Sequence, residues 1–170
     1  MKQRIVNAGI FLAVLSIVSQ LVSAIFISQK VLSGAINFVL FGVMIWVIIH
    51  FVKAQRNEQA GLISFGKAFK MSFLSLLIGG LIGFVFTYFY NNFIDNSVME
   101  AQVYETLKGT QEGIKQLSEE QQRETLVTVE KWTRFMYTPL GVAALYAVFS
   151  IVYALISLII AAVLKKTEFN

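Results

Sequence analysis

Residues 140–164 read LGVAALYAVFSIVYALISLIIAAVL and contain no charged side chain before the run ends at Lys165 and Lys166. A bilayer core about 30 Å thick requires roughly 20 consecutive apolar residues in a helix. The run meets this length, and it is too long for a typical strand. It therefore predicts a transmembrane helix and, with it, a membrane protein.

Three earlier uncharged runs resemble it, and we expect an all-α membrane protein with spans at about residues 5–27, 31–50, 70–90 and 139–164. The four helices are expected to form one bundle, a single integral membrane domain over residues 1–170. The first run also resembles a signal peptide, because Lys2 and Arg4 precede it and small residues surround Ser23. We expect the helix to be retained, since the apolar stretch continues through Ile27.

The composition excludes several classes of protein. Hydrophobic residues make up 56% of the chain and charged residues only 14%, with a mean hydropathy of +0.68, whereas soluble domains are about 25% charged. A disordered chain, a coiled coil and an ordinary soluble enzyme are therefore excluded. The chain has no cysteine and one histidine, which rules out disulfides, thiolate metal sites and a multi-histidine site in one chain.

The distribution of charge predicts the orientation of the spans. The N-terminus, segment 53–70 and the C-terminus carry eight bases, whereas segment 91–137 carries five bases and eight acids. Basic residues accumulate on the cytoplasmic side of membrane proteins. We therefore expect both termini and a loop at 53–69 to be cytoplasmic. Because the bases lie at the ends of apolar runs, no nucleic-acid partner is expected.

Segment 91–137 predicts an extracytoplasmic helical hairpin between the third and fourth spans. Met99, Val103 and Leu107 mark the apolar stripe of one helix, and Ser118 with Gln121 forms the capping-box pattern that opens a second. The hairpin is either a cap that docks a partner or ligand, or a solvated connection between two spans.

Small residues recur every three or four positions in the first and last spans, where helices in lipid pack closely. The third span adds Gly79 and Gly83. We expect the first, third and fourth spans to meet closely, within one chain or between two. The residues that form these stripes are Gly9, Ala13, Ser16, Gln20 and Ser23 in the first span, and Ala143, Ala147, Ser150, Ala154, Ser157 and Ala161 in the last.

The span interiors contain no Asp, Glu, Lys or Arg, so a coupled ion transporter is not expected. Gln20, Tyr146 and Tyr153 are the candidate intramembrane polar positions. They either line a shared cavity or satisfy one another inside the bundle. No nucleophile elbow, metalloprotease motif, P-loop or dinucleotide fingerprint is present. We predict no catalytic residue, metal site or cofactor, and a protein that is not an enzyme.

Segment 56–70 reads RNEQAGLISFGKAFK. We expect Gly61 and Gly66 to interrupt regular helix, and Ser64 to cap the third span. Lysines here would meet anionic lipid headgroups. The segment is therefore a candidate docking loop for a partner or a lipid, or an interfacial linker that tilts the third span. Its candidate residues are Arg56, Gly61, Ser64, Phe65, Gly66, Lys67, Phe69 and Lys70.

The same segment resembles the uncharacterised bacterial membrane protein family called domain of unknown function DUF4199. In that family an Arg after the second span precedes a Gly and then an Ile-Ser-Phe-Gly-x-Ala-Phe run. The matching positions here are Arg56, Gly61, Ile63, Ser64, Phe65, Gly66, Ala68 and Phe69. The resemblance covers most of the chain and implies the inner membrane of a bacterium, but no activity. The family's Pro-Glu after the third span is absent from residues 92–100.

Three functions follow as hypotheses. The first is a non-enzymatic protein that assembles or regulates another membrane component. The second is a small oligomeric transporter or pore for an uncharged or lipidic solute. The third is an enzyme acting on lipid through the hairpin glutamates or His50. Membrane lipids, a membrane protein partner and a second copy of the chain are the partners these hypotheses require.

Overall fold

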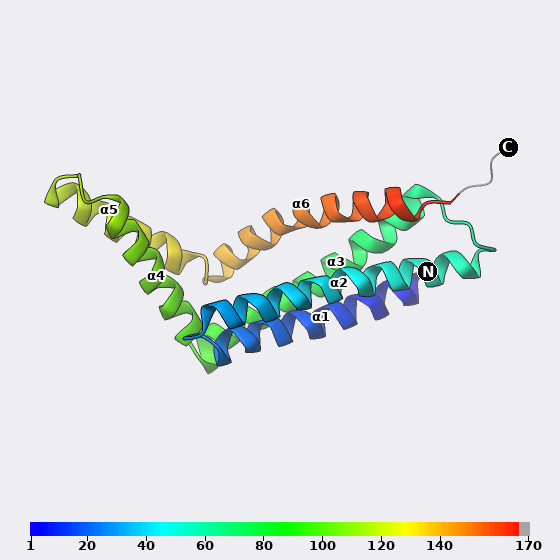
Figure 1. Ribbon diagram of the computed structural model, residues 1–170, viewed down its shortest axis with the longest axis horizontal. Coiled ribbons are helices and arrows are strands. Elements are labelled where there is room, and N and C mark those ends of the chain that lie inside the picture. Colours follow the sequence, from blue (N-terminus) through cyan, green and yellow to red (C-terminus); the bar gives the residue numbers. More distant parts are fainter. Residues whose placement is uncertain (167–170) are drawn as a thin grey trace. The chain divides into compact units, whose positions relative to one another are not determined.

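The computed structural model describes residues 1–166. Its helices are α1 (Lys2–Ile25), α2 (Lys30–Glu58), α3 (Phe65–Phe89), the short π-helix η1 (Tyr90–Ile94), α4 (Ser97–Gly113), α5 (Glu119–Phe135) and α6 (Pro139–Leu164), shown in Figure 1. In this described part of the chain, four helical segments are long and apolar enough to cross a membrane: Lys2–Ile25, Lys30–Glu58, Phe65–Ile94 and Pro139–Leu164. The predicted all-α, multi-pass membrane protein is confirmed.

The helix ends differ from the predicted span ends on one side of the bundle. α2 continues to Glu58 and α3 begins at Phe65, so the connection comprises residues 59–64 and not the predicted 53–69. Hydropathy marks where a chain leaves the lipid, whereas helix ends depend on backbone capping. Lys, Gln and Arg are good helix formers, so α2 extends past its apolar run.

The chain forms two compact units, Met1–Phe84 together with the chain from Tyr146 onward, and Val85–Leu145. In the first unit, α1 and α2 run side by side in opposite directions (Figure 1). The rings of Phe11 and Phe51 lie 5.9 Å apart, and Arg4 forms an ion pair with Glu58. The short turn between the two helices makes this antiparallel pairing possible.

Glycines allow α1 and α3 to approach closely. A Cβ atom built on Gly79 would lie 2.5 Å from Leu12 Cβ, and one on Gly83 would lie 2.7 Å from Ser16 Cβ. The hydroxyl of Ser75 also donates a hydrogen bond of 3.2 Å to the carbonyl of Ile5. The small-residue stripe of α1 therefore packs against α3 of the same chain, which is one of the two arrangements that were predicted.

α6 meets α3 through aromatic side chains, and part of its small-residue stripe is buried. Tyr153 lies where a Cβ on Gly80 would be, and Ser157 and Ala161 are fully buried. Ala147, earlier in the same stripe, is exposed. The predicted close contacts of the third span with the first and fourth are thus confirmed, and the α6 stripe is buried only toward the end of the helix. The core at that end contains Ile5, Leu12, Val47, Ile48, Val52, Ile63, Ala68, Met71, Leu76, Ile160, Ala161 and Leu164.

The second unit contains α4 and α5, which pack against each other and are joined by residues 114–118. Ser118 opens α5 through the predicted capping box: its hydroxyl accepts from the backbone N–H of Gln121, whose side chain reaches back to the Ser118 N–H. At the far end of α5, Thr138 begins α6 by accepting a 3.2 Å hydrogen bond from the N–H of Gly141. Side-chain caps therefore mark the first residues of α5 and of α6.

We expect Gly79→Ala to destabilise the bundle, because its Cβ would overlap Leu12. Overpacking of this kind costs about 1–3 kcal/mol. Gly42→Ala is the matched control, since a Cβ there meets nothing within 4 Å, and removal of a helical glycine stabilises by about 0.5–1 kcal/mol. Unfolding titrations in mixed detergent micelles measure both changes. Equal effects of the two variants would contradict the close approach of α1 and α3.

Candidate functional site

The predicted docking loop is a capped and compact connection. The N–H of Gly61 donates to the carbonyl of Arg56 over 3.0 Å, while Ala60 and Gly61 have φ values of 52° and 80°. This is the Schellman arrangement that ends a helix, with the left-handed residue at Ala60. Gly61 therefore interrupts the helix as predicted. Gly66 does not, because it lies in the first turn of α3 with open space around it.

A single β-bridge attaches the loop to the chain that follows α6. Ile63 and Lys166 exchange two backbone hydrogen bonds of 2.9 Å each. Ile63 is only 1% exposed, and Leu164 and Ala68 beside it in the core are 5% and 0% exposed. Burial of Ile63 and the bridge together fix the loop to the end of α6, which no local sequence pattern indicates.

The start of α3 carries the remaining loop candidates. Ser64 precedes the first residue of α3, and its hydroxyl accepts a 3.4 Å hydrogen bond from the N–H of Lys67, as expected of a cap. Phe65 and Phe69 stack with ring centroids 6.4 Å apart, and Phe69 stacks on Phe73 at 5.5 Å. We call these three phenylalanines the aromatic ladder. Lys67 and Lys70 are exposed on the same turns of α3.

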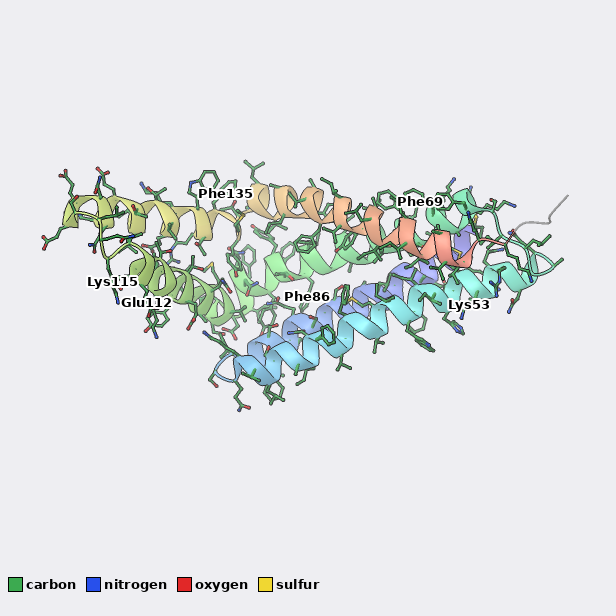
Figure 2. All side chains as sticks on the ribbon, turned by 45° about the horizontal axis from the view of Figure 1, so that its top comes forward. Lys53, Phe69, Phe86, Glu112, Lys115 and Phe135 are labelled. Atoms are coloured by element: carbon green, nitrogen blue, oxygen red, sulfur yellow. The ribbon has the colours of Figure 1, made fainter. Side chains whose placement is uncertain are left out.

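Most of the positive charge of the first unit lies at the end where α2 and α6 end and α3 begins, which we call the basic end. It contains one described acid, Glu58, which is paired with Arg4. In Figure 2, Lys53 lies on the lower flank, on α2, and Phe69 lies on the upper flank beside the end of α6. The bases of this end are Lys2, Arg4, Lys53, Arg56, Lys67, Lys70, Lys165 and Lys166.

The three predicted intramembrane positions lie on α1 and α6. The Tyr146 hydroxyl donates a 2.9 Å hydrogen bond to the carbonyl of Leu77, and Tyr153 lies against Gly80, so both tyrosines pack on one stretch of α3. Gln20 lies on α1, one turn beyond Ser16, which faces Gly83. Leu77 and Gly83 lie six positions apart on α3, about 9 Å along the axis. The Tyr146 ring also lies 5.8 Å from the ring of Phe84, so the contacts of Tyr146 extend along this part of α3.

A half-buried polar network joins α1 and α2. Ser19 donates to Asn37 Oδ1 at 2.5 Å, and Asn37 Nδ2 donates to the Ser23 hydroxyl at 3.1 Å, which ties α1 to α2. The spacing of Ser19 and Ser23 by one helical turn is the signal that could have revealed this network. Among residues 1–166, buried Gln55 Oε1 and Ser157 Oγ have no hydrogen-bond partner.

A groove of about 480 Å³ lies between α4 and α5 in the second unit. Apolar Leu107, Leu126 and Val127 line it together with charged and polar groups from both helices. α5 has no buried residue, and Val127 is 46% exposed. The apolar stripe of the hairpin is therefore only partly covered. The charged and polar lining residues are Gln111, Glu119, Gln122, Arg123 and Glu130.

Arg134 joins the two helices of the second unit. Its Nη1 and Nη2 donate to the two carboxylate oxygens of Glu100 at 2.8 and 3.0 Å, and its Nε donates to Glu130 at 2.9 Å. The hydrogen bonds from Arg134 lower the pKa of Glu100 below its usual 4.5, and those to Glu100 and Glu130 raise the pKa of Arg134. Such a two-point contact also fixes the orientation of the guanidinium relative to the carboxylate, which a contact with a single charge does not.

We expect Ala60→Gly to stabilise the loop, because a left-handed conformation costs a non-glycine residue about 1–2 kcal/mol. The matched variant Gly61→Ala should destabilise it for the same reason, since Gly61 has φ +80°. Unfolding titrations in detergent measure the change in the free energy of unfolding for both variants. If the two changes have the same sign, the positive φ values are not those of the folded protein.

We expect Arg134→Gln to loosen the pairing of α4 and α5, seen as faster backbone hydrogen exchange in both helices. Lys131→Gln, an exposed change on the same helix, should leave exchange unchanged. A lowered pKa of Glu100 means that its contribution is present above pH 4.5 and is lost as the pH falls below that value. The protection factors of both helices, which are corrected for the intrinsic pH dependence of amide exchange, should therefore fall in acid in the parent protein, and less so in Arg134→Gln. Identical profiles would contradict this role.

The comparisons with known proteins return one family. The model of the family described as protein of unknown function (DUF4199) matches residues 7–166, nearly the whole chain. No curated protein and no solved structure matches the sequence. The matched range contains the loop at 59–64, the four apolar helices and the α4–α5 hairpin. The chain belongs to the DUF4199 family.

Proposed function

We propose that the protein is a non-enzymatic component of a bacterial inner membrane that assembles or regulates another membrane protein. Both termini and the loop at 59–64 are cytoplasmic in this proposal, and the α4–α5 hairpin is extracytoplasmic. The charge asymmetry supports this orientation, because the basic end carries eight bases and the segment 91–137 has more acids than bases.

The observation that carries the proposal is the open groove between α4 and α5. An exposed apolar patch surrounded by polar groups marks sites of interaction. The groove is lined by Leu107, Leu126 and Val127 and by side chains of both charges. This lining suits an amphipathic helix laid along the two helices, with apolar anchors inside and polar residues at the edge. We infer that the occupant is an extracytoplasmic helix of a membrane partner.

The alternative, an oligomeric transporter or pore, has less support in the bundle. A solute path requires polar groups that are free to meet the solute. Here the hydroxyls of Ser72, Ser75 and Tyr146 donate to backbone carbonyls, and Asn37 bonds to serines of both helices. Asn37, Ser75 and Tyr146 thereby join neighbouring helices, and the bond of Ser72 lies within α3. Solute flux into proteoliposomes that contain the purified protein would support the alternative.

A photo-crosslinking residue at Val127 tests the proposed groove, with the same residue at Glu124 as the control, because Glu124 is exposed on α5 outside the groove. We expect one membrane protein to crosslink in stoichiometric amount at Val127 and not at Glu124. Crosslinks only between two copies of the chain would contradict a separate partner.

A second measurement uses the purified pair in nanodiscs. Val127→Asp should weaken binding at least tenfold, because it places a charge in the apolar part of the groove. The adjacent Thr128→Asp adds the same charge at an exposed residue outside the groove and should have little effect. Equal binding by the parent protein and Val127→Asp would exclude the groove as the docking site.

A further inference from the structure

The β-bridge between Ile63 and Lys166 brings together lysines that are far apart in the sequence. Paired backbones lie about 4.8 Å apart, so Lys165 and Lys166 adjoin the loop just before α3. Lys67 lies in the first turn of α3, and Lys70 lies one turn further along. All four are exposed. We call them the bridge lysines.

The bridge lysines have no carboxylate partner within residues 1–166. The acid of this end, Glu58, is engaged by Arg4, and the hydrogen bond of Lys67 is to the neutral Gln59, at 3.5 Å. Like charges held near one another repel. The Ile63–Lys166 bridge and the buried Ile63 nevertheless hold Lys166 beside the loop that precedes Lys67. An external anion bound among the lysines would offset this repulsion.

The neighbouring surface indicates which anion fits. The aromatic ladder begins next to the bridge lysines and continues along α3, and Phe65 is 40% exposed. α3 is one of the helices apolar enough to enter the bilayer. A ligand that bridges both surfaces needs a phosphate at one end and hydrocarbon at the other. From this juxtaposition we propose that the bridge lysines and the aromatic ladder bind an anionic glycerophospholipid, with its phosphate among the lysines and an acyl chain along the ladder.

The test places a reporter at the site. Phe65→Trp, in a background with Trp46→Phe and Trp132→Phe, gives one tryptophan next to the bridge lysines. The protein is reconstituted into vesicles of phosphatidylcholine with phosphatidylglycerol, and acyl-chain bromine is placed on one lipid or the other. Bromine quenches nearby tryptophan, so the ratio of quenching reports which lipid occupies the site. We expect phosphatidylglycerol to be preferred.

Two pairs of substitutions distinguish a site from general attraction. Lys67→Gln with Lys166→Gln removes two bridge lysines, whereas Lys2→Gln with Lys53→Gln removes two charges elsewhere on the basic end, Lys53 lying on the opposite flank (Figure 2). Each lysine near an anionic surface contributes about fivefold. The first pair should therefore lower the preference by about five- to thirty-fold, and the second should leave it nearly unchanged. Lys67→Arg with Lys166→Arg should retain it.

Three results would overturn the inference. The first is that both glutamine pairs lower the preference for phosphatidylglycerol equally, and the second is that the two brominated lipids quench the parent protein equally. The third is that millimolar inorganic phosphate displaces the lipid from the site. Helicity and unfolding midpoint, measured on the same samples, separate these results from misfolding, and exposed lysines changed to glutamine keep the backbone bridge. The inference does not depend on the α4–α5 groove, so it and the proposed function fail independently.

Discussion

The close approach of α1 to α3 is the constraint on which the first unit depends. Between helices in lipid there is little hydrophobic driving force, so contact requires small residues and hydrogen bonds across the interface. Gly79 and Gly83 leave room for Leu12 and Ser16, and Ser75 bonds to the backbone of α1. Because a short turn joins α2 to α1, this contact also positions α2 and therefore the loop that follows it. The packed core then forms at the end of the bundle that carries that loop.

The loop at 59–64 shows local and distant interactions acting together. Ala60 and Gly61 end α2 by a backbone pattern that the residues themselves specify, and Ser64 starts α3. The Ile63–Lys166 bridge then fixes this short connection to a segment more than a hundred residues away in the sequence. A loop that is held in this way keeps its charged residues at fixed positions. For the proposed headgroup site, such preorganisation contributes more to binding than additional charge would.

The second unit is built differently from the first. Its helices are polar, so their pairing relies on the capping box at Ser118 and the fork of Arg134 on Glu100, and on a narrow apolar stripe. A stripe shared by two helices covers only part of each, which leaves the α4–α5 groove open. The proposed partner would complete this apolar surface, as a third helix does in a bundle. The two proposals, assembly with another membrane protein and binding of lipid, thus concern separate units of one chain.

The sequence by itself determined the class of the protein, because uncharged runs long enough to cross a bilayer leave no other stable structure for the backbone in lipid. It also determined the caps at Ser64 and Ser118 and the use of Gly79 and Gly83 in packing, since these depend on neighbours along one helix or on the size of one side chain. The burial of Ile63 in the core and the positions along α3 at which Tyr146 and Tyr153 pack were decided by tertiary structure. So was the bridge that gathers the lysines. Each of these depends on how helices distant in sequence align along their axes, and periodicity within one helix carries no information about that alignment.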